Sequence, residues 1–229
     1  MSAVAAALVD SECAMGVLPI GTLNHFARAL GIPLDVESAC EIIASGIVRS
    51  VDVGEVNGRI FVNNSSLGLY PTIVRGREQD QRLGSSKWTA LFWSILAVLR
   101  HYPMLTVGLS SVKGGQVTRR TPLVFIGNNE YEMKGFEIGS RRTLDGGKLS
   151  VYVAPKDGPA GLLRMGVAAV FGRLRRGVDF DFLATDNLRV DVVRKTMLVA
   201  TDGEVSSLVP PLFYRIRPLA LRVIVPAKR

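Results

Sequence analysis

Two short stretches of the sequence carry residue types that could do phosphate chemistry. The first runs from Gly16 to Pro33 and is centred on the pair Gly21-Thr22. Its pattern predicts a buried strand over Gly16–Ile20, a tight turn, and a helix over Leu23–Leu30 capped by the Thr22 hydroxyl. A strand that enters a helix through a glycine turn directs free main-chain N–H groups at one point, which favours an anion such as phosphate. Such junctions also occur in α/β proteins without a ligand, so an ordinary structural role stays open.

The second stretch is Thr201-Asp-Gly-Glu204, which follows an apolar run. An oriented carboxylate can take a proton from a hydroxyl group that attacks a phosphate. Asp-Gly is also a common turn sequence, and a turn without chemistry is the simpler interpretation of these residues alone.

Composition limits the class of protein. The chain has 229 residues, 48% hydrophobic and 21% charged, which is typical of one or two globular domains. Its net charge of +8 favours polyanionic partners: nucleic acid, anionic lipid headgroups or nucleotide phosphates. Cys13 and Cys40 have no metal-ligand spacing and are expected to be reduced thiols. His25 and His101 have no evident ligand partners either.

No targeting or membrane-spanning segment is expected. The N-terminus lacks a basic region, and Asp10 and Glu12 interrupt its apolar run. The longest apolar segment, Thr89–Leu99, is shorter than the roughly 20 residues that a spanning helix needs. We therefore expect a cytoplasmic protein, soluble or peripheral at the inner membrane face.

The hydrophobic pattern changes period near residue 46. Before it, helical periodicity predicts helices over Ser2–Val9 and Asp35–Ser45, with Asp35 as the cap of the second. After it, apolar runs separated by turn residues predict an antiparallel β-sandwich with two inserted helices, Ser86–His101 and Gly161–Arg176. The expected strands are Ile47–Val56, Arg59–Asn63, Leu105–Ser111, Gln116–Thr121, Leu123–Gly127, Lys148–Ala154, Asp179–Ala184, Asn187–Val193, Met197–Ala200 and Leu219–Val225, and 65–84 is expected to be a loop.

Several motifs together resemble a known family. Leu18-Pro-Ile-Gly-Thr-Leu-Asn-His-Phe-Ala-Arg28 resembles the P-L-G-T-x-N-D-F-A-R signature of the diacylglycerol kinase catalytic family, which includes bacterial lipid kinases and sphingosine kinases. Leu123–Asn129, Thr143–Leu149 and Arg217–Val223 resemble further motifs of that family, and Thr201–Glu204 matches its Asp-Gly-Glu turn. The matches extend from about residue 2 to 226 in the family's order.

The resemblance implies a fold in three parts. Residues 1–46 would be the C-terminal part of a NAD-kinase-like α/β nucleotide-binding domain. Residues 47–209 would form the antiparallel β-sandwich of a lipid kinase, and 210–229 a strand that returns to the α/β domain. The implied fold class is thus α/β followed by all-β.

The resemblance also implies a reaction, namely Mg²⁺- and ATP-dependent transfer of the γ-phosphoryl group to a hydroxyl of diacylglycerol or a related lipid at a membrane surface. Gly21, Thr22 and Asn24 would then lie against the nucleotide. Asp202 would be the base and Glu204 its neighbour. No nucleic acid is expected among these partners, and the chain could form a homo-oligomer.

Three departures from the family pattern are visible. His25 replaces the usual Asp. Gly146 replaces the second Asp of an Asp-Asp turn that helps to hold Mg²⁺ in the family, so Asp145 alone remains as a metal ligand there. The family's phosphate-binding Gly-Gly-Asp-Gly-Thr loop is absent. We expect an N-terminally truncated chain, and a start codon placed too late or a missing half supplied by another component stay open.

Two alternatives to an active kinase therefore stay open. The first is a non-catalytic lipid- or phosphate-binding remnant of the family. The second is a basic nucleic-acid-binding domain, which the sequence favours least because it lacks the aromatic and arginine-rich motifs of such surfaces.

Overall fold

The structure is a computed structural model that describes residues 1–71, 104–111, 115–131, 141, 143–155, 158, 161, 164 and 180–227. The helix predicted over Ser86–His101 and nearly all of the one over Gly161–Arg176 lie outside these residues. Within the described ranges, no helix is long and apolar enough to cross a membrane.

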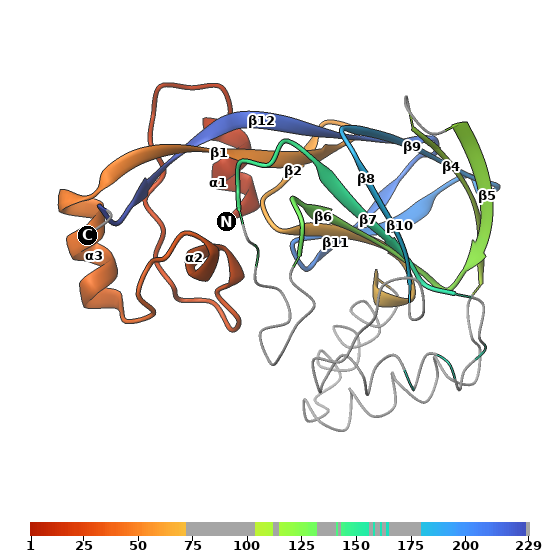
Figure 1. Ribbon diagram of the computed structural model, residues 1–229, viewed down its shortest axis with the longest axis horizontal. Coiled ribbons are helices and arrows are strands. Elements are labelled where there is room, and N and C mark those ends of the chain that lie inside the picture. The colour runs from red at the N-terminus through yellow and green to blue at the C-terminus, as the bar shows by residue number, and fades with distance from the viewer. Residues whose placement is uncertain are drawn as a thin grey trace.

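Two six-stranded antiparallel sheets make up most of the described chain (Figure 1). The first has the order β2-β1-β12-β9-β4-β5 and the second the order β11-β10-β3-β6-β7-β8. The strands are β1 Ile47–Val56, β2 Arg59–Phe61, β3 Asn64–Gly68, β4 Leu105–Ser111, β5 Gly115–Thr121, β6 Leu123–Asn128, β7 Leu149–Val153, β8 Asp181–Thr185, β9 Asn187–Val192, β10 Met197–Thr201, β11 Glu204–Leu208 and β12 Leu212–Val225. The predicted antiparallel sandwich is confirmed.

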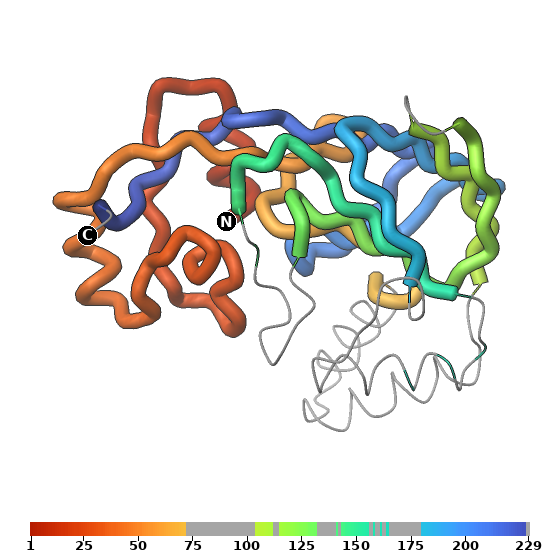
Figure 2. Tube along the Cα trace, in the orientation of Figure 1, coloured from red at the N-terminus to blue at the C-terminus, as the bar shows by residue number. Residues whose placement is uncertain are grey.

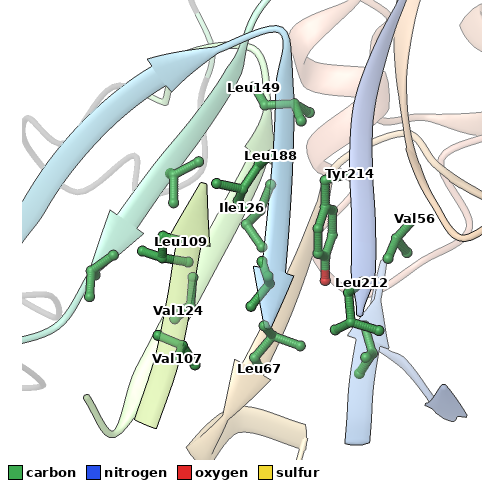
Figure 3. Packing of buried hydrophobic residues seen from close by; sticks show 14 of the residues in the cluster. Val56, Leu67, Val107, Leu109, Val124, Ile126, Leu149, Leu188, Leu212 and Tyr214 are labelled. Carbon is green, nitrogen blue, oxygen red and sulfur yellow. The ribbon is translucent and has the colours of Figure 1, made fainter. Parts of the chain in front are cut away.

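The inner faces of the two sheets enclose one apolar core (Figure 3). Alternation along each strand directs every second side chain inward, as with Val107 and Leu109 of β4 and Val124 and Ile126 of β6. The ring of Tyr214 lies in this core, and its hydroxyl is 3.1 Å from Ser65 Oγ, so its one polar atom is satisfied. Burial raises the pKa of this tyrosine.

A second apolar core lies where the helices pack on the ends of β1 and β12. The helices are α1 Ser2–Leu8, α2 His25–Ala29 and α3 Val36–Ser45. Phe26, Val51 and Leu221 are fully buried in this core. Figures 1 and 2 show the N-terminal segments gathered at one end of the molecule, with β1 and β12 running from there into the sandwich. Because these two strands contribute to both cores, the division at residue 46 stays a prediction.

The junction between the cores is marked by a bulge in β12. The β1–β12 register runs from Val51↔Leu221 to Val53↔Arg217, so three residues of β12 stand opposite Asp52 alone. The central one, Leu219, has a φ of 52°. The fully buried Asp52 carboxylate accepts hydrogen bonds from Leu219 N (2.8 Å) and Gly147 N (2.7 Å). This carboxylate therefore supports both the bulge and the loop before β7.

Several local predictions are confirmed. Asp35 caps α3 by accepting a hydrogen bond from Ser38 N (2.8 Å). Asn57 and Gly58, both at positive φ, connect β1 to β2. Gly54 is required on β1 because a Cβ there would lie 2.1 Å from the Phe61 ring.

Other predictions are wrong. Residues 16–20 form no strand, and only the adjacent Met15 makes an isolated parallel bridge, to Val223. The helix after the turn is shorter than predicted, and its N-cap is Asn24 rather than Thr22. The expected loop over 65–84 is wrong at its start, because residues 65–68 belong to β3. Apolar periodicity did not indicate β3 or β11, because serine and other polar residues fill much of both strands. It indicated only Leu219–Val225 of β12, which begins at Leu212.

Candidate active site at the Asp202 turn

Asp202 lies at the tip of the β10–β11 hairpin. Thr201 pairs with Glu204, and the two residues between them, Asp202 and Gly203, have φ values of 49° and 89°. A two-residue hairpin with two left-handed positions favours Asp-Gly, so the sequence itself specifies this turn. The main-chain N of Asp202 donates to Asn64 O (2.8 Å), which holds the turn against the β2–β3 connection.

The Asp202 carboxylate accepts four hydrogen bonds from the residues that the structure describes. Its Oδ1 accepts from Asn63 N (2.7 Å) and Asn64 N (3.0 Å). Its Oδ2 accepts from Val62 N (2.8 Å) and from the hydroxyl of Ser2, the first residue of α1 (2.6 Å). Three consecutive main-chain N–H groups therefore fix the position of this half-buried carboxylate.

Arg141 lies on the other side of the β2–β3 connection. Its side chain is almost fully buried, and an isolated bridge to Tyr131 holds its main chain. Its Nη1 donates to Val62 O (2.7 Å) and its Nη2 to Asn63 Oδ1 (2.8 Å), while Nε has no hydrogen-bond partner among the described residues. Val62 and Asn63 thus each bond to both Asp202 and Arg141, so the same short segment connects an anion to a buried cation.

Two aromatic rings flank the Arg141 guanidinium. The Phe26 ring of α2 lies 5.9 Å from it and the Tyr131 ring 5.6 Å. Distances below about 6 Å allow cation–π attraction. Because Phe26 belongs to the second core and Tyr131 to the sandwich side, Arg141 connects α2 to the Asp202 turn.

The electrostatics of this region are mainly cationic on the α2 side. The pKa of His25 is lowered, first by burial and then by the positive charges of Arg141 and Arg28. Burial also lowers the pKa of Arg141, whereas the Asp202 charge acts in the opposite direction. A negatively charged group between α2 and the Asp202 turn would thus be attracted by two guanidinium groups.

The Gly21–Asn24 turn is exposed and is held by its own asparagine. Gly21 N donates to Asn24 Oδ1 (2.9 Å), and Asn24 Nδ2 donates to Pro19 O (2.9 Å). Gly21 and Thr22 are both exposed. Asn24 therefore supports the turn, and Thr22 presents its side chain to solvent.

The remaining predicted site residues make none of the described contacts with the Asp202 carboxylate. Glu204 begins β11 and is exposed. Asp145 is also exposed and pairs with Arg49 Nη2 at 2.7 Å. A Cβ on Gly146 would lie 2.8 Å from Asn129 Oδ1, so a second Asp would require the Asn129 side chain to shift.

The described residues do not fit a protein-held Mg²⁺ ion. Among them, no three His, Cys, Asp or Glu side chains cluster in a way that could hold a metal. A hard cation prefers several carboxylate and carbonyl oxygens. Arg49 already supplies the positive charge beside Asp145, so the prediction of a metal at this turn has no support in the described geometry.

An apolar hollow of about 510 Å³ lies between the outer edges of the two sheets. Val117 of β5, Val151 of β7 and Phe182 of β8 contribute to its lining. Arg119 and Asp181, which pair at 3.4 Å, also line it. Its composition suits hydrocarbon.

Sequence reasoning missed three residues of the site region: Ser2, Arg141 and Asp52. Ser2 is a small residue in an alanine-rich helix, and its contact with Asp202 is separated by 200 positions in the chain. Arg141 is one of two adjacent arginines, and nothing in the sequence indicates that it is buried. Of these three residues, only Asp52 could have been found from the local sequence. It lies within a valine-rich strand, and a carboxylate buried in such a strand needs hydrogen-bond partners.

Comparison with known proteins agrees with this architecture of a helical layer on a NAD-kinase-type antiparallel sandwich. Residues 1–56 match the model of the diacylglycerol kinase catalytic domain, and residues 72–225 match that of the YegS C-terminal NAD kinase beta sandwich-like domain. The chain therefore belongs to the diacylglycerol kinase/YegS family of lipid kinases. The family expected from the sequence motifs is confirmed.

Individual relatives are distant but cover most of the chain. It is 25% identical to the diacylglycerol kinase of Bacillus subtilis over 91% of this chain and 68% of the relative. It is 29% identical to a "Probable lipid kinase YegS-like" of Pseudomonas savastanoi pv. phaseolicola over 97% of this chain and 71% of the relative. A crystal structure of a diacylglycerol kinase from Bacillus anthracis has a TM-score of 0.60 at 20% identity, covering 90% of this chain and 64% of its own, which shows a shared fold.

Proposed function

We propose that the chain acts as an ATP-dependent lipid kinase that transfers the γ-phosphoryl group to a hydroxyl of diacylglycerol or a related lipid. The observation that carries the proposal is the Asp202 carboxylate, which three main-chain N–H groups hold in place beside a buried arginine. Family membership supports the reaction class. The name of the Bacillus subtilis relative supports diacylglycerol as the first substrate to test.

In the proposed reaction Asp202 orients the acceptor hydroxyl and receives its proton. The hydroxyl oxygen forms a bond to the γ-phosphorus, the bond to the β-phosphate oxygen breaks, and ADP leaves. Phosphoryl transfer has a loose transition state, so positioning and charge neutralisation matter more than base strength. A rigidly held carboxylate is suited to that task.

The cations on the α2 side would neutralise the nucleotide phosphates. Arg28 is exposed and Arg141 contributes its field from within the protein. The Gly21–Asn24 turn would lie against the nucleotide, with Asn24 preserving the turn and Gly21 and Thr22 making the contact. Glu204 would assist only through the local field of the turn. Mg²⁺ would enter with the nucleotide phosphates, because the described residues offer no site of their own.

The lipid would approach from a membrane surface. The net charge of +8 favours anionic headgroups. The apolar hollow between the sheet edges could accept acyl chain. These features support a peripheral location at the inner membrane face.

The test is transfer of labelled phosphate from ATP to lipids in mixed micelles that contain diacylglycerol, monoacylglycerol or a sphingoid base. We expect labelled lipid with the wild-type chain and a loss of about 10²- to 10⁴-fold in kcat for Asp202→Asn. The assay temperature must lie well below the unfolding midpoint of the variant. Turnover of Asp202→Asn at the wild-type rate would overturn the role of Asp202.

A non-catalytic phosphate- or lipid-binding module is the second candidate. The pairing of Asp145 with Arg49 favours it, since the charge that would hold a metal there is already neutralised. Saturable ATP binding without transfer to any of the three lipids would support this alternative.

A further inference from the structure

The Ser2 hydroxyl occupies a particular place on Asp202. A carboxylate offers about four lone-pair positions to hydrogen-bond donors. Val62 N, Asn63 N, Asn64 N and Ser2 Oγ fill the four positions of Asp202. A substrate hydroxyl can donate to this carboxylate only by displacing one of these donors.

The three main-chain donors are fixed by other bonds. Val62 O accepts hydrogen bonds from Arg141 Nη1 (2.7 Å) and Asn128 Nδ2 (2.9 Å). Asn63 O accepts from Asn128 N (2.8 Å), and Asn64 is the first residue of β3 and pairs with Gly127. Moving any of these amides would break a buried hydrogen-bond network as well as its bond to Asp202.

Ser2 is different because its donor is a single rotatable hydroxyl. Its bond to Asp202 Oδ2 measures 2.6 Å, and its side chain is only half-buried. Rotation about one side-chain bond releases the carboxylate and exposes the hydroxyl to water, with no change in the main chain. Of the four donors, it is the one that a ligand can replace at lowest cost.

We propose that the Ser2 hydroxyl holds the place of the substrate hydroxyl on Asp202 Oδ2, and that the lipid must displace it in order to bind. The inference rests on the proposed function for the identity of the ligand. It assigns the acceptor hydroxyl to the Oδ2 side of the carboxylate, next to the first turn of α1. Ser2 then competes with the substrate and takes no part in proton transfer.

If Ser2 competes with the substrate, removing its hydroxyl should lower KM, whereas removing a residue that helps to bind the substrate would raise KM. In Ser2→Ala the fourth lone pair is free, so KM for a dispersed short-chain diacylglycerol should fall about three- to tenfold. This is the net effect of one typical hydrogen bond, because the displaced hydroxyl of the half-buried Ser2 is hydrated in the wild-type chain. The kcat should stay within about twofold, because the bound state is the same. Ser2→Thr retains the hydroxyl and should restore the wild-type KM. Ser11→Ala is the matched control, because Ser11 Oγ donates to Leu8 O at the other end of α1.

The result that would overturn the inference is a kcat lowered tenfold or more in Ser2→Ala, which would make Ser2 a proton relay. An unchanged KM accompanied by lower stability would overturn it too, since Ser2 would then serve only to attach α1.

Direct binding separates this inference from the proposed function. The dissociation constant of dioctanoylglycerol is measured by calorimetry for the wild-type chain and Ser2→Ala. Tighter binding by Ser2→Ala without turnover in either protein would support the place of Ser2 and overturn the kinase proposal. Turnover by both proteins with equal dissociation constants would support the kinase proposal and overturn the place of Ser2. Absence of binding by either protein would overturn both proposals.

Discussion

The hydrogen bonds of the Asp202 carboxylate stabilise the fold in addition to any role in the proposed chemistry. The change in unfolding free energy caused by Asp202→Asn measures this stabilisation. With its amide oxygen toward Asn63 N and Asn64 N, the asparagine keeps two bonds, but its NH2 group then faces Val62 N. Ser2 can reverse and accept from that NH2 group. The opposite amide orientation would lose two main-chain bonds, so the first is favoured and one donor is left unpaired.

One unpaired main-chain donor costs about 1–3 kcal/mol of unfolding free energy. For a chain of this size, about 2 kcal/mol lowers Tm by roughly 4–8 °C. Urea and thermal unfolding of Asp202→Asn and wild type measure the difference. Glu204→Gln is the matched control, because that carboxylate lies across the same turn but is exposed, and its change should stay within about 0.5 kcal/mol. A stability of Asp202→Asn equal to that of wild type would refute the hydrogen bonds assigned to this carboxylate.

Three further predictions concern stability. Arg141→Leu removes one of the two described donors to Val62 O, which keeps Asn128 Nδ2, and it removes the described donor to Asn63 Oδ1. The unfolding free energy in urea should fall by about 1–3 kcal/mol. Arg141→Lys should recover less than half of this loss because it lacks the planar fork, and full recovery by Lys would contradict the assigned bonds. The pKa of His25 is lowered in the folded chain, so the unfolded chain binds a proton at His25 first as pH falls through 6.5. The unfolding free energy should therefore fall from pH 7 to 5 more steeply in wild type than in His25→Gln. Equal slopes of unfolding free energy against pH for the two proteins would contradict the lowered pKa. Leu219 has a φ of 52° and is 55% exposed, so Leu219→Gly should raise the unfolding free energy by about 1 kcal/mol by relieving backbone strain. Leu219→Ala keeps a Cβ and should not raise it. Equal unfolding midpoints for the Gly and Ala variants would show that no strain is relieved.

Much of the fold could be predicted because its signals are local. The strands around Val107 and Val124 alternate or run apolar between turn residues, and Asp35 caps its helix as expected. Strands β3 and β11 were missed since their residues are largely Asn, Ser and Glu, and they become strands through pairing with β6 and β10. Tertiary pairing overrides a weak local preference there.

The site was predictable only in part, for the same reason. Family motifs identified the Asp202 turn and the Gly21 turn, although their roles remain proposals. The contacts of Asp202 with Ser2 and of Asn63 with Arg141 join residues far apart in the sequence, and hydrophobic periodicity does not predict such contacts. The Asn24 cap escaped prediction because its side chain turns back to Gly21 instead of forward into the helix.

The most direct test of the kinase proposal compares two lipids that differ in one atom. Vesicles contain either a 1,2-diacylglycerol or its 3-deoxy analogue, and ADP release and labelled lipid are measured with Mg²⁺ and ATP. We predict ADP release only with the hydroxyl-bearing lipid, with one phosphate in the lipid for each ADP. Equal ADP release with both lipids, or nucleotide binding without any transfer, would contradict phosphorylation of a lipid hydroxyl at Asp202.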